Sequence, residues 1–353
     1  MLINIGILGF AHGHVDAYVT AWKKMKRTVH VVGGWDHDFQ RVAKAGERHG
    51  LQMYDNPEDL LASGDVDAVM IAAETSLHAE LVEMAARAGK TVILQKPMAL
   101  TLEEADRIVR AVKRSGVRFT LAWQMRVDPQ NVQMRKLVQD ARLGRIFMIR
   151  RRHGLSTHTW AGFENTWHVK PELNRGMWAD DAAHPIDWLL WMKGLPESVS
   201  AEIATLHSPK VPDDNGVAVF RYADGTLAEI ACSFTCLAGE NTTEIVGEKG
   251  VIIQNFGDGP SAQAPRADDA AGLKWLLKGH KQWTISGIRS PENHGQRIAN
   301  LAKPLCEFLQ GKREPICTAE EGRMSLAMTL ACYRSSELGR RVMIAEMDQK
   351  KLA

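Results

Sequence analysis

The chain opens with Leu2-Ile3-Asn4-Ile5-Gly6-Ile7-Leu8-Gly9-Phe10-Ala11-His12-Gly13-His14, the stretch that decides its fold. A run rich in Ile and Leu ends at Gly9, a turn of small residues follows, and a helical pattern begins at His14. In that helix the apolar residues Val15, Tyr18, Val19 and Trp22 share one face. A strand, a tight turn and a helix in this order present backbone N–H groups to a phosphate.

The turn matches only part of the dinucleotide fingerprint G-x-G-x-x-G. Gly9 occupies the first position, Ala11 stands at the second glycine and His14 at the third. Alanine is small enough to let a pyrophosphate approach, but glycine turns after strands are common, so the turn alone leaves the question open. The candidate phosphate-binding residues are Gly9, Phe10, Ala11, His12, Gly13 and His14.

Length and composition describe an ordinary soluble protein. The 353 residues are enough for two domains, with 24% charged and 45% apolar residues. A net charge of +2 without blocks of Lys or Arg argues against a nucleic-acid partner, and no stretch is long enough to cross a bilayer. The five cysteines show no zinc spacing and the first residues do not form a signal peptide. We therefore expect a cytoplasmic protein without membrane contact or bound metal.

Strand and helix patterns alternate through the first third of the chain. Strand patterns cover 29–36, 67–73, 91–95 and 117–122, and helical patterns lie between them. The helix at 102–113 begins with Thr101 and Glu104 in a capping-box pattern. This alternation predicts an α/β domain over residues 1–122, a doubly wound parallel sheet that binds a dinucleotide.

Ligands of such sheets bind outside the carboxyl ends of the strands. Asp36 ends the second strand pattern, where an acid accepts the ribose hydroxyls and repels a 2′-phosphate, so we expect NAD rather than NADP. The alternative is that Asp36 caps the helix that begins near Phe39. Lys96, followed by Pro97, is expected to point into the crevice, the alternative being a solvated surface lysine. The other candidates at this edge are Ala73, Glu74, His78, Gln95 and Gln124.

Residues 123–353 change in character. Strand patterns at 146–153, 217–222, 226–236, 243–246 and 251–254, with turn signals at 223–225 and 247–250, predict an α+β domain with a largely antiparallel open sheet. A polar, aromatic loop covers 154–175. We expect a flexible flap over 256–291 and helices over 293–310 and 319–338.

Asp180 and His184 carry the densest chemistry of this half. Their spacing of four places both side chains on one helical face, where a histidine beside a carboxylate can exchange a proton near neutral pH. One alternative is a buried histidine satisfied by its neighbour. Another is a zinc site formed with Asp181, although no third ligand follows at a recognised spacing.

These pieces, in this order, resemble the glucose–fructose oxidoreductase/inositol dehydrogenase/MocA (Gfo/Idh/MocA) family of NAD(P)-dependent oxidoreductases. Gln95-Lys96-Pro97 is similar to the family's Glu-Lys-Pro, and the stretch from Asp180 to His184 to its Asp-x-x-x-His helix. Residues 76–81 and 123–126 resemble two further family segments. The sequence departs from the family at Ala11, His14, Gln95 and Arg175.

The resemblance implies hydride transfer between NAD and a hydroxyl carbon of a sugar, sugar acid or cyclic polyol. Lys96 and His184 would be the catalytic pair, and Asp180 would bind a neighbouring hydroxyl and orient the histidine. The substrate walls would be Trp123, Arg126, Trp160, Trp167 and His168. The resemblance also implies a homodimer or homotetramer. Two alternatives stay open: a glycosidase or lyase that oxidises its substrate transiently with bound NAD, and a ligand-sensing regulator without catalysis.

Overall fold

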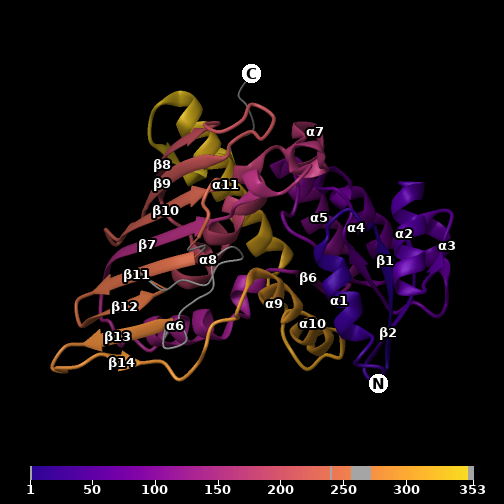
Figure 1. Ribbon diagram of the computed structural model, residues 1–353, viewed down its shortest axis with the longest axis horizontal. Helices are drawn as coiled ribbons and strands as arrows, with labels where there is room; N and C mark the ends of the chain where they lie inside the picture. The colour runs from indigo at the N-terminus through magenta and orange to yellow at the C-terminus, as the bar shows by residue number, and fades with distance from the viewer. Residues whose placement is uncertain (1, 239–240, 256–271, 349–353) are drawn as a thin grey trace. The chain divides into compact units, whose positions relative to one another are not determined.

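The structure is a computed structural model of the chain, and it describes residues 2–238, 241–255 and 272–348. The chain forms two compact units, whose elements are labelled in Figure 1. The first comprises the chain through Val127 together with Glu172–Asn174 and Gly295–Leu326, and the second comprises Asp128–Pro171, Arg175–His294 and the chain from Ala327.

The first unit contains a six-stranded parallel sheet in the order β3-β2-β1-β4-β5-β6. Its strands are β1 (Ile3–Leu8), β2 (Val29–Trp35), β3 (Gln52–Met53), β4 (Ala68–Ile71), β5 (Thr91–Leu94) and β6 (Phe119–Leu121). The strand order reverses at β1, which is the position where doubly wound sheets bind their ligands. The predicted doubly wound parallel sheet is confirmed.

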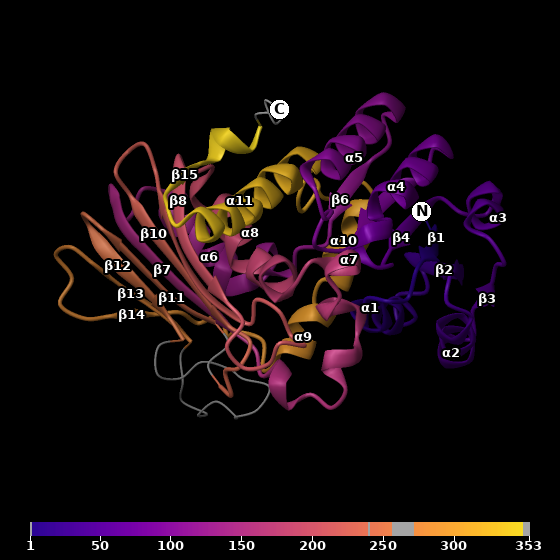
Figure 2. The same ribbon diagram turned by 90° about the horizontal axis from the view of Figure 1, so that it is seen from above.

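Several helices of this unit begin at residues whose side chains cap them. They include α1 (His14–Trp22), α2 (Phe39–His49), α3 (Pro57–Ala62), α4 (His78–Arg87), α5 (Leu102–Ser115) and α10 (Ala302–Leu309). The expected capping box starts α5, because Thr101 Oγ1 accepts from the Glu104 N–H and Glu104 accepts from the Thr101 N–H. Helices α1 and α2 lie on one face of the sheet and α4 and α5 on the other (Figure 2).

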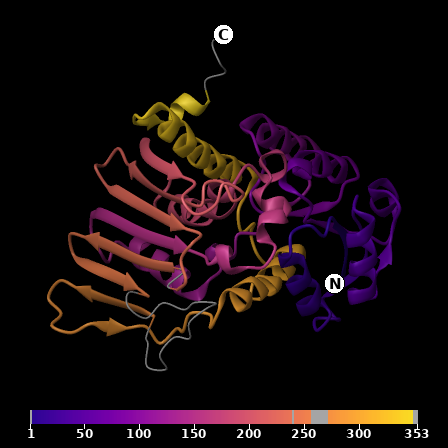
Figure 3. The same cartoon turned by 45° about the horizontal axis from the view of Figure 1, so that its top comes forward.

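The second unit contains a nine-stranded mixed sheet in the order β14-β13-β12-β11-β7-β10-β9-β8-β15, seen in Figure 3. Only β10 and β7 pair in parallel; the other neighbours are antiparallel, so the largely antiparallel open sheet is confirmed. The strands are β7 (Ile146–Gly154), β8 (Ser198–Ala204), β9 (Asn215–Arg221), β10 (Leu227–Ser233), β11 (Asn241–Gly247), β12 (Gly250–Gln254), β13 (Leu273–Leu277), β14 (Thr284–Ile285) and β15 (Val342–Met343).

Helices cover one face of this sheet (Figure 2). They are α6 (Pro129–Gln139), α8 (Ala183–Lys193) and, from Ala327 on, α11 (Ala319–Leu338). The guanidinium of Arg151 on β7 lies 4.2 Å from the ring centroid of Trp188 on α8. Ser335 of α11 accepts a hydrogen bond from the Ala201 N–H of β8. The inner face of the sheet is therefore fixed to the helices that carry Asp180 and His184.

Two predicted elements differ from the structure. The flap expected at 256–291 is wrong from Leu273 on, because β13 pairs with β12 and β14 with β13; residues 256–271 lie outside the described residues. The helix expected at 293–310 is divided into α9 (His294–Ala299) and α10. Pro304 accounts for the division, because proline cannot donate to the carbonyl four residues before it.

Candidate active site

The turn after β1 lies closely against the end of β4. Gly9 has φ +90°, and a Cβ at this position would come within 2.4 Å of the Ala73 Cα. The Gly9 N–H donates to the Trp35 carbonyl, and the His12 N–H donates to that of Ala72. A Cβ at Gly13, the residue before α1, would meet no atom within 4 Å. The turn is therefore packed against the end of β4 at Gly9, while Gly13 borders open space, as the approach of a pyrophosphate requires.

Asp36 joins this turn to the end of β2. Its Oδ2 accepts from the Phe10 N–H at 2.6 Å, and Arg41 forms a fork on the same carboxylate with distances of 3.0 and 2.8 Å. Asp38, not Asp36, caps α2 by accepting from the N–H groups of Gln40 and Arg41. The helix-cap alternative for Asp36 is wrong, and its carboxylate lies at the predicted sheet edge.

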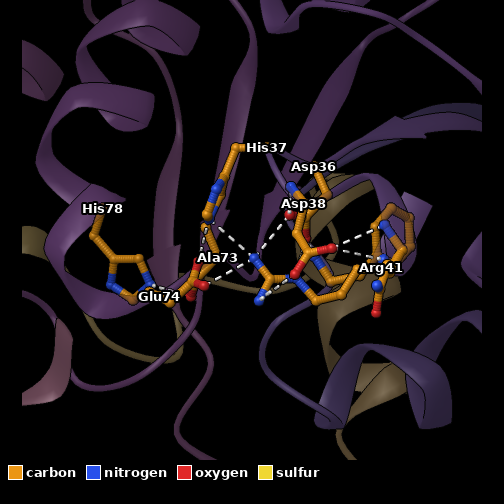
Figure 4. Close-up of polar contacts among 9 residues, drawn as sticks. Asp36, His37, Asp38, Arg41, Ala73, Glu74 and His78 are labelled. Atoms are coloured by element: carbon orange, nitrogen blue, oxygen red, sulfur yellow. Dashed lines mark hydrogen bonds and ion pairs between the residues drawn. The ribbon is translucent and has the colours of Figure 1, made fainter. Parts of the chain in front are cut away.

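Glu74 reaches the same cluster from the end of β4, as Figure 4 shows. One carboxylate oxygen lies 2.8 Å from Arg41 Nη2, and the other lies 3.0 Å from His37 Nε2. Sequence patterns pointed to Glu74 but missed Arg41 and His37. The sequence signal that could have revealed them is their position: His37 follows Asp36 directly, and Arg41 lies in the first turn of α2.

His78 braces two loops of the edge rather than facing solvent. It is completely buried; Nδ1 lies 2.9 Å from the Pro97 carbonyl and Nε2 3.2 Å from that of Ala73. Burial lowers the pKa of His78 to about 4, so the ring is neutral at physiological pH. A neutral ring carries one N–H, which one of these carbonyls receives at a time.

The residues after β5 are buried as well. Lys96 is only 2% exposed, so the alternative of a solvated surface lysine is wrong. The Gln95 side chain is also buried, and its amide lies beside the Tyr18 hydroxyl. Burial raises the pKa of the nearby Tyr18 hydroxyl, an effect that Gln95 opposes.

A 3₁₀ helix at Gln124–Arg126 follows β6 and carries three predicted site residues. Trp123, Gln124 and Arg126 are all buried. Arg126 Nη1 donates to the Ile316 carbonyl at 3.2 Å and to Glu321 at 2.9 Å. Arg126 follows β6, and its side chain is held by hydrogen bonds to residues of the same unit.

In the second unit a π-helix, Trp178–Ala182, leads directly into α8. Asp180 Oδ2 lies 2.8 Å from His168 Nδ1, and Asp181 Oδ1 lies 3.5 Å from His184 Nε2. A wider turn at this point changes the α-helical geometry assumed from the spacing of Asp180 and His184, and it adds Asp181 as a neighbour of His184. Pro185 follows at once, and because it lacks an N–H it favours a departure from α-helical bonding there.

The predicted aromatic residues lie on the loop between β7 and the π-helix. The buried Trp167 stacks on His168 with ring centroids 4.0 Å apart, which places it beside Asp180. Trp160 is 38% exposed and packs edge-on against Phe163. The structure thus brings Trp167, His168 and Asp180 together and leaves Trp160 at the loop surface.

The start of the π-helix is held by Tyr333 of α11, which sequence patterns did not reveal. The Tyr333 hydroxyl accepts from the Ala179 N–H at 3.1 Å and donates to Asp213 at 2.8 Å. Asp213 leaves no room at Gly176, where a Cβ would come within 2.4 Å of its Oδ2. These contacts join residues far apart in the chain, so no local pattern could report them.

The described residues offer no cluster of three or more His, Cys, Asp and Glu side chains that could hold a metal ion. The same ranges contain no helix with the length and apolar character needed to cross a membrane.

Two family models match this chain. Residues 3–122 match the oxidoreductase family with an NAD-binding Rossmann fold, and residues 131–253 match the Gfo/Idh/MocA C-terminal domain. The chain belongs to the Gfo/Idh/MocA family. Its members are NAD(P)-dependent oxidoreductases, so the predicted resemblance is confirmed.

Several characterised members of the Gfo/Idh/MocA family are distant relatives of this chain. Inositol 2-dehydrogenase 2 of Saccharopolyspora erythraea is 29% identical over 71% of this chain and 73% of its own length. Levoglucosan dehydrogenase of Pseudarthrobacter phenanthrenivorans is 27% identical, over 76% of each chain. A structure of levoglucosan dehydrogenase with NADH and levoglucosan superposes with a TM-score of 0.81, at 20% identity over 98% of this chain and all of the other. The last comparison shows a shared fold.

The buried neutral His78 predicts acid sensitivity of this family member. Its pKa of about 4 lies below the ordinary 6.5, so the unfolded chain binds the proton more tightly. Stability should therefore fall as the pH drops from about 6.5 towards 4, by up to about 3 kcal/mol from this group. Urea unfolding across that range measures the loss.

The variant His78→Gln should be less stable at pH 7.5 and should lose less stability on acidification than the native chain. His30→Gln, at an exposed position of β2, is the control. An unchanged pH dependence in His78→Gln would contradict this assignment.

Proposed function

We propose that this protein oxidises a hydroxyl carbon of a sugar, sugar acid or cyclic polyol with NAD, or catalyses the reverse reduction. The observation that carries the proposal is the burial of both candidate catalytic groups: Lys96 is 2% exposed and His184 is 1% exposed. Ionisable side chains are seldom buried without a role or a partner. Inositol and levoglucosan dehydrogenases among the relatives support this substrate class.

The proposed NAD-binding domain, residues 1–122, belongs to the first unit and supplies groups that fit NAD. The open turn from Gly9 to His14 would hold the pyrophosphate, and Asp36 would accept the ribose hydroxyls. The buried Gln95 amide is a further candidate donor. The remaining residues proposed for this site are Ala73, His78, Lys96 and Gln124, and Glu74, which would act through its ion pair with Arg41. When bound, the oxidised nicotinamide supplies the hydride acceptor.

The chain's own residues would handle the proton and the charge. His184 takes the hydroxyl proton at its ring, and Asp181, 3.5 Å from Nε2, stabilises the imidazolium that forms. Lys96 would stabilise the negative charge that develops on a substrate oxygen. Asp180, fixed by His168, binds a neighbouring hydroxyl. The proposed substrate walls are Trp123, Arg126, Trp160, Trp167 and His168.

Absorbance at 340 nm with NAD or NADP and a panel of sugars, inositols and sugar acids tests this proposal. Lys96→Ala and His184→Ala should each lower kcat about 100-fold or more, because each removes an acid–base or charge-stabilising group. Lys90→Ala and His49→Gln are matched controls, since both side chains make structural contacts elsewhere in the first unit.

Turnover that survives both active-site substitutions would contradict the proposed roles. Glycoside cleavage without added NAD would favour the lyase alternative, and nucleotide binding without any turnover would favour the regulator.

Tyr333 is proposed to position the π-helix that carries Asp180. Tyr333→Phe removes both hydrogen bonds of the hydroxyl while keeping the ring. We expect kcat to fall about tenfold with little change in the KM for NAD, because the cofactor-binding residues belong to the first unit. Tyr222→Phe, which removes a hydroxyl bond to the Gly194 carbonyl, is the control. Equal losses in the two variants would contradict a positioning role.

We also propose that the helix-free face of the nine-stranded sheet pairs with a second copy. Five apolar residues lie directly opposite one another across neighbouring strands: Leu227, Met148, Val246, Val251 and Leu276. Beside this row, Arg150 lies 3.4 Å from Glu229 and 3.6 Å from Glu244. An apolar row next to charges of both signs can face its own copy across a twofold axis.

Met148→Glu should convert the native dimer or tetramer into a smaller species, because it places a charge within the apolar row. Light scattering at micromolar concentration measures the change. Val132→Glu, at an exposed position of α6, is the control. A native protein that is monomeric at this concentration would contradict the proposal.

We also propose that the protein is located in the cytoplasm. Cys232, Cys306 and Cys332 are buried thiols, and burial raises the pKa of each. Buried, protonated thiols are compatible with a reducing compartment.

A further inference from the structure

A buried carboxylate stands at the end of β4, where the first unit turns towards α4. Glu74 is only 3% exposed. A carboxylate removed from water needs a charged or hydrogen-bonding partner, and Glu74 has two: Arg41 at 2.8 Å and His37 at 3.0 Å. Both partners come from the β2–α2 segment, so Glu74 links β4 to the segment that carries Asp36.

Arg41 is held between carboxylates on opposite sides (Figure 4). The Nε and Nη2 atoms of Arg41 donate to the Asp36 carboxylate. Nη2 also forms an ion pair with the Glu74 carboxylate. Asp38 lies 3.9 Å from Nη1. Three carboxylates, those of Asp36, Asp38 and Glu74, therefore surround the single guanidinium of Arg41. Carboxylates outnumber guanidinium groups in this cluster.

This cluster bears directly on the choice between NAD and NADP. In Rossmann domains an acid at the end of β2 accepts the ribose 2′-hydroxyl, whereas a nearby arginine binds the 2′-phosphate of NADP. Asp36 and Arg41 supply both groups here. The guanidinium is already engaged with Asp36 and Glu74, so its charge is neutralised where a 2′-phosphate would need it.

We infer that Glu74 determines cofactor specificity by holding Arg41 against Asp36 and away from a 2′-phosphate. Asp36 acts on the ribose directly, and Glu74 acts through Arg41, so it is a positioning residue. This inference rests on the proposed function, in which NAD binds at this edge of the sheet. It assigns Glu74 a second task besides linking β4 to the β2–α2 segment.

Calorimetric titration of the full chain with NAD⁺ and with NADP⁺ tests the inference without turnover. In Glu74→Gln the side chain keeps its size and loses its charge, which frees Arg41 on one side. We expect the ratio of Kd for NADP⁺ to Kd for NAD⁺ to fall about tenfold, the size expected when one charge leaves a partly solvated ion cluster. The Kd for NAD⁺ should change less than about threefold.

Two further variants separate this mechanism from a general effect. Glu83→Gln breaks a comparable carboxylate–arginine fork, with Arg107, elsewhere in the same unit and should leave the ratio unchanged. In an Arg41→Ala background, Glu74→Gln should lose most of its effect on the ratio, because the arginine is the group that Glu74 controls.

Three results would overturn the inference: an unchanged ratio in Glu74→Gln, equal weakening of both dinucleotides, or the full effect without Arg41. If the native chain binds neither dinucleotide, the proposed function itself fails. If it binds NAD⁺ and the ratio does not move, only the role of Glu74 fails.

Discussion

The close approach of the first turn to β4 is the constraint on which the first unit depends. Gly9 must lack a side chain, because its Cβ would occupy the same space as the backbone of Ala73. Gly34 of β2 must also lack a side chain, because a Cβ there would come within 2.5 Å of the Phe10 ring. With the turn held on both sides, the Phe10 N–H points at Asp36, and the open N-terminus of α1 lies above the sheet edge.

Charge is distributed along that edge in a consistent way. Between β2 and β4, three carboxylates enclose Arg41, which is the basis of the inferred preference for ribose hydroxyls over an added phosphate. At α4, the neutral His78 braces the loops without adding charge. After β5, the buried Lys96 supplies a cation where the proposed chemistry develops negative charge on oxygen. In the proposed function, the Arg41 cluster lies near the adenosine ribose and Lys96 acts on the substrate oxygen.

Local sequence patterns predicted many of the strands and helices but not their long-range contacts. The alternation of strands and helices, the capping box at Thr101 and the hairpin turns have a short sequence range, and all appear in the structure. Tyr333, Asp213 and Arg41 were missed because their roles come from residues that folding brings together. The π-helix was missed because the spacing of Asp180 and His184 assumes a regular helix, which Pro185 disfavours. Strands β13 and β14 were missed because their pairing partners, not their composition, define them.

The central claim is that NAD binds at the carboxyl edge of the six-stranded sheet, with its adenosine ribose on Asp36. A crystal structure of the protein grown with NAD⁺ tests this claim most directly. The account predicts the pyrophosphate over the turn from Gly9 to His14, the ribose hydroxyls on Asp36, and Arg41 still held by Glu74. A dinucleotide bound elsewhere, or a ribose that does not contact Asp36, would contradict it.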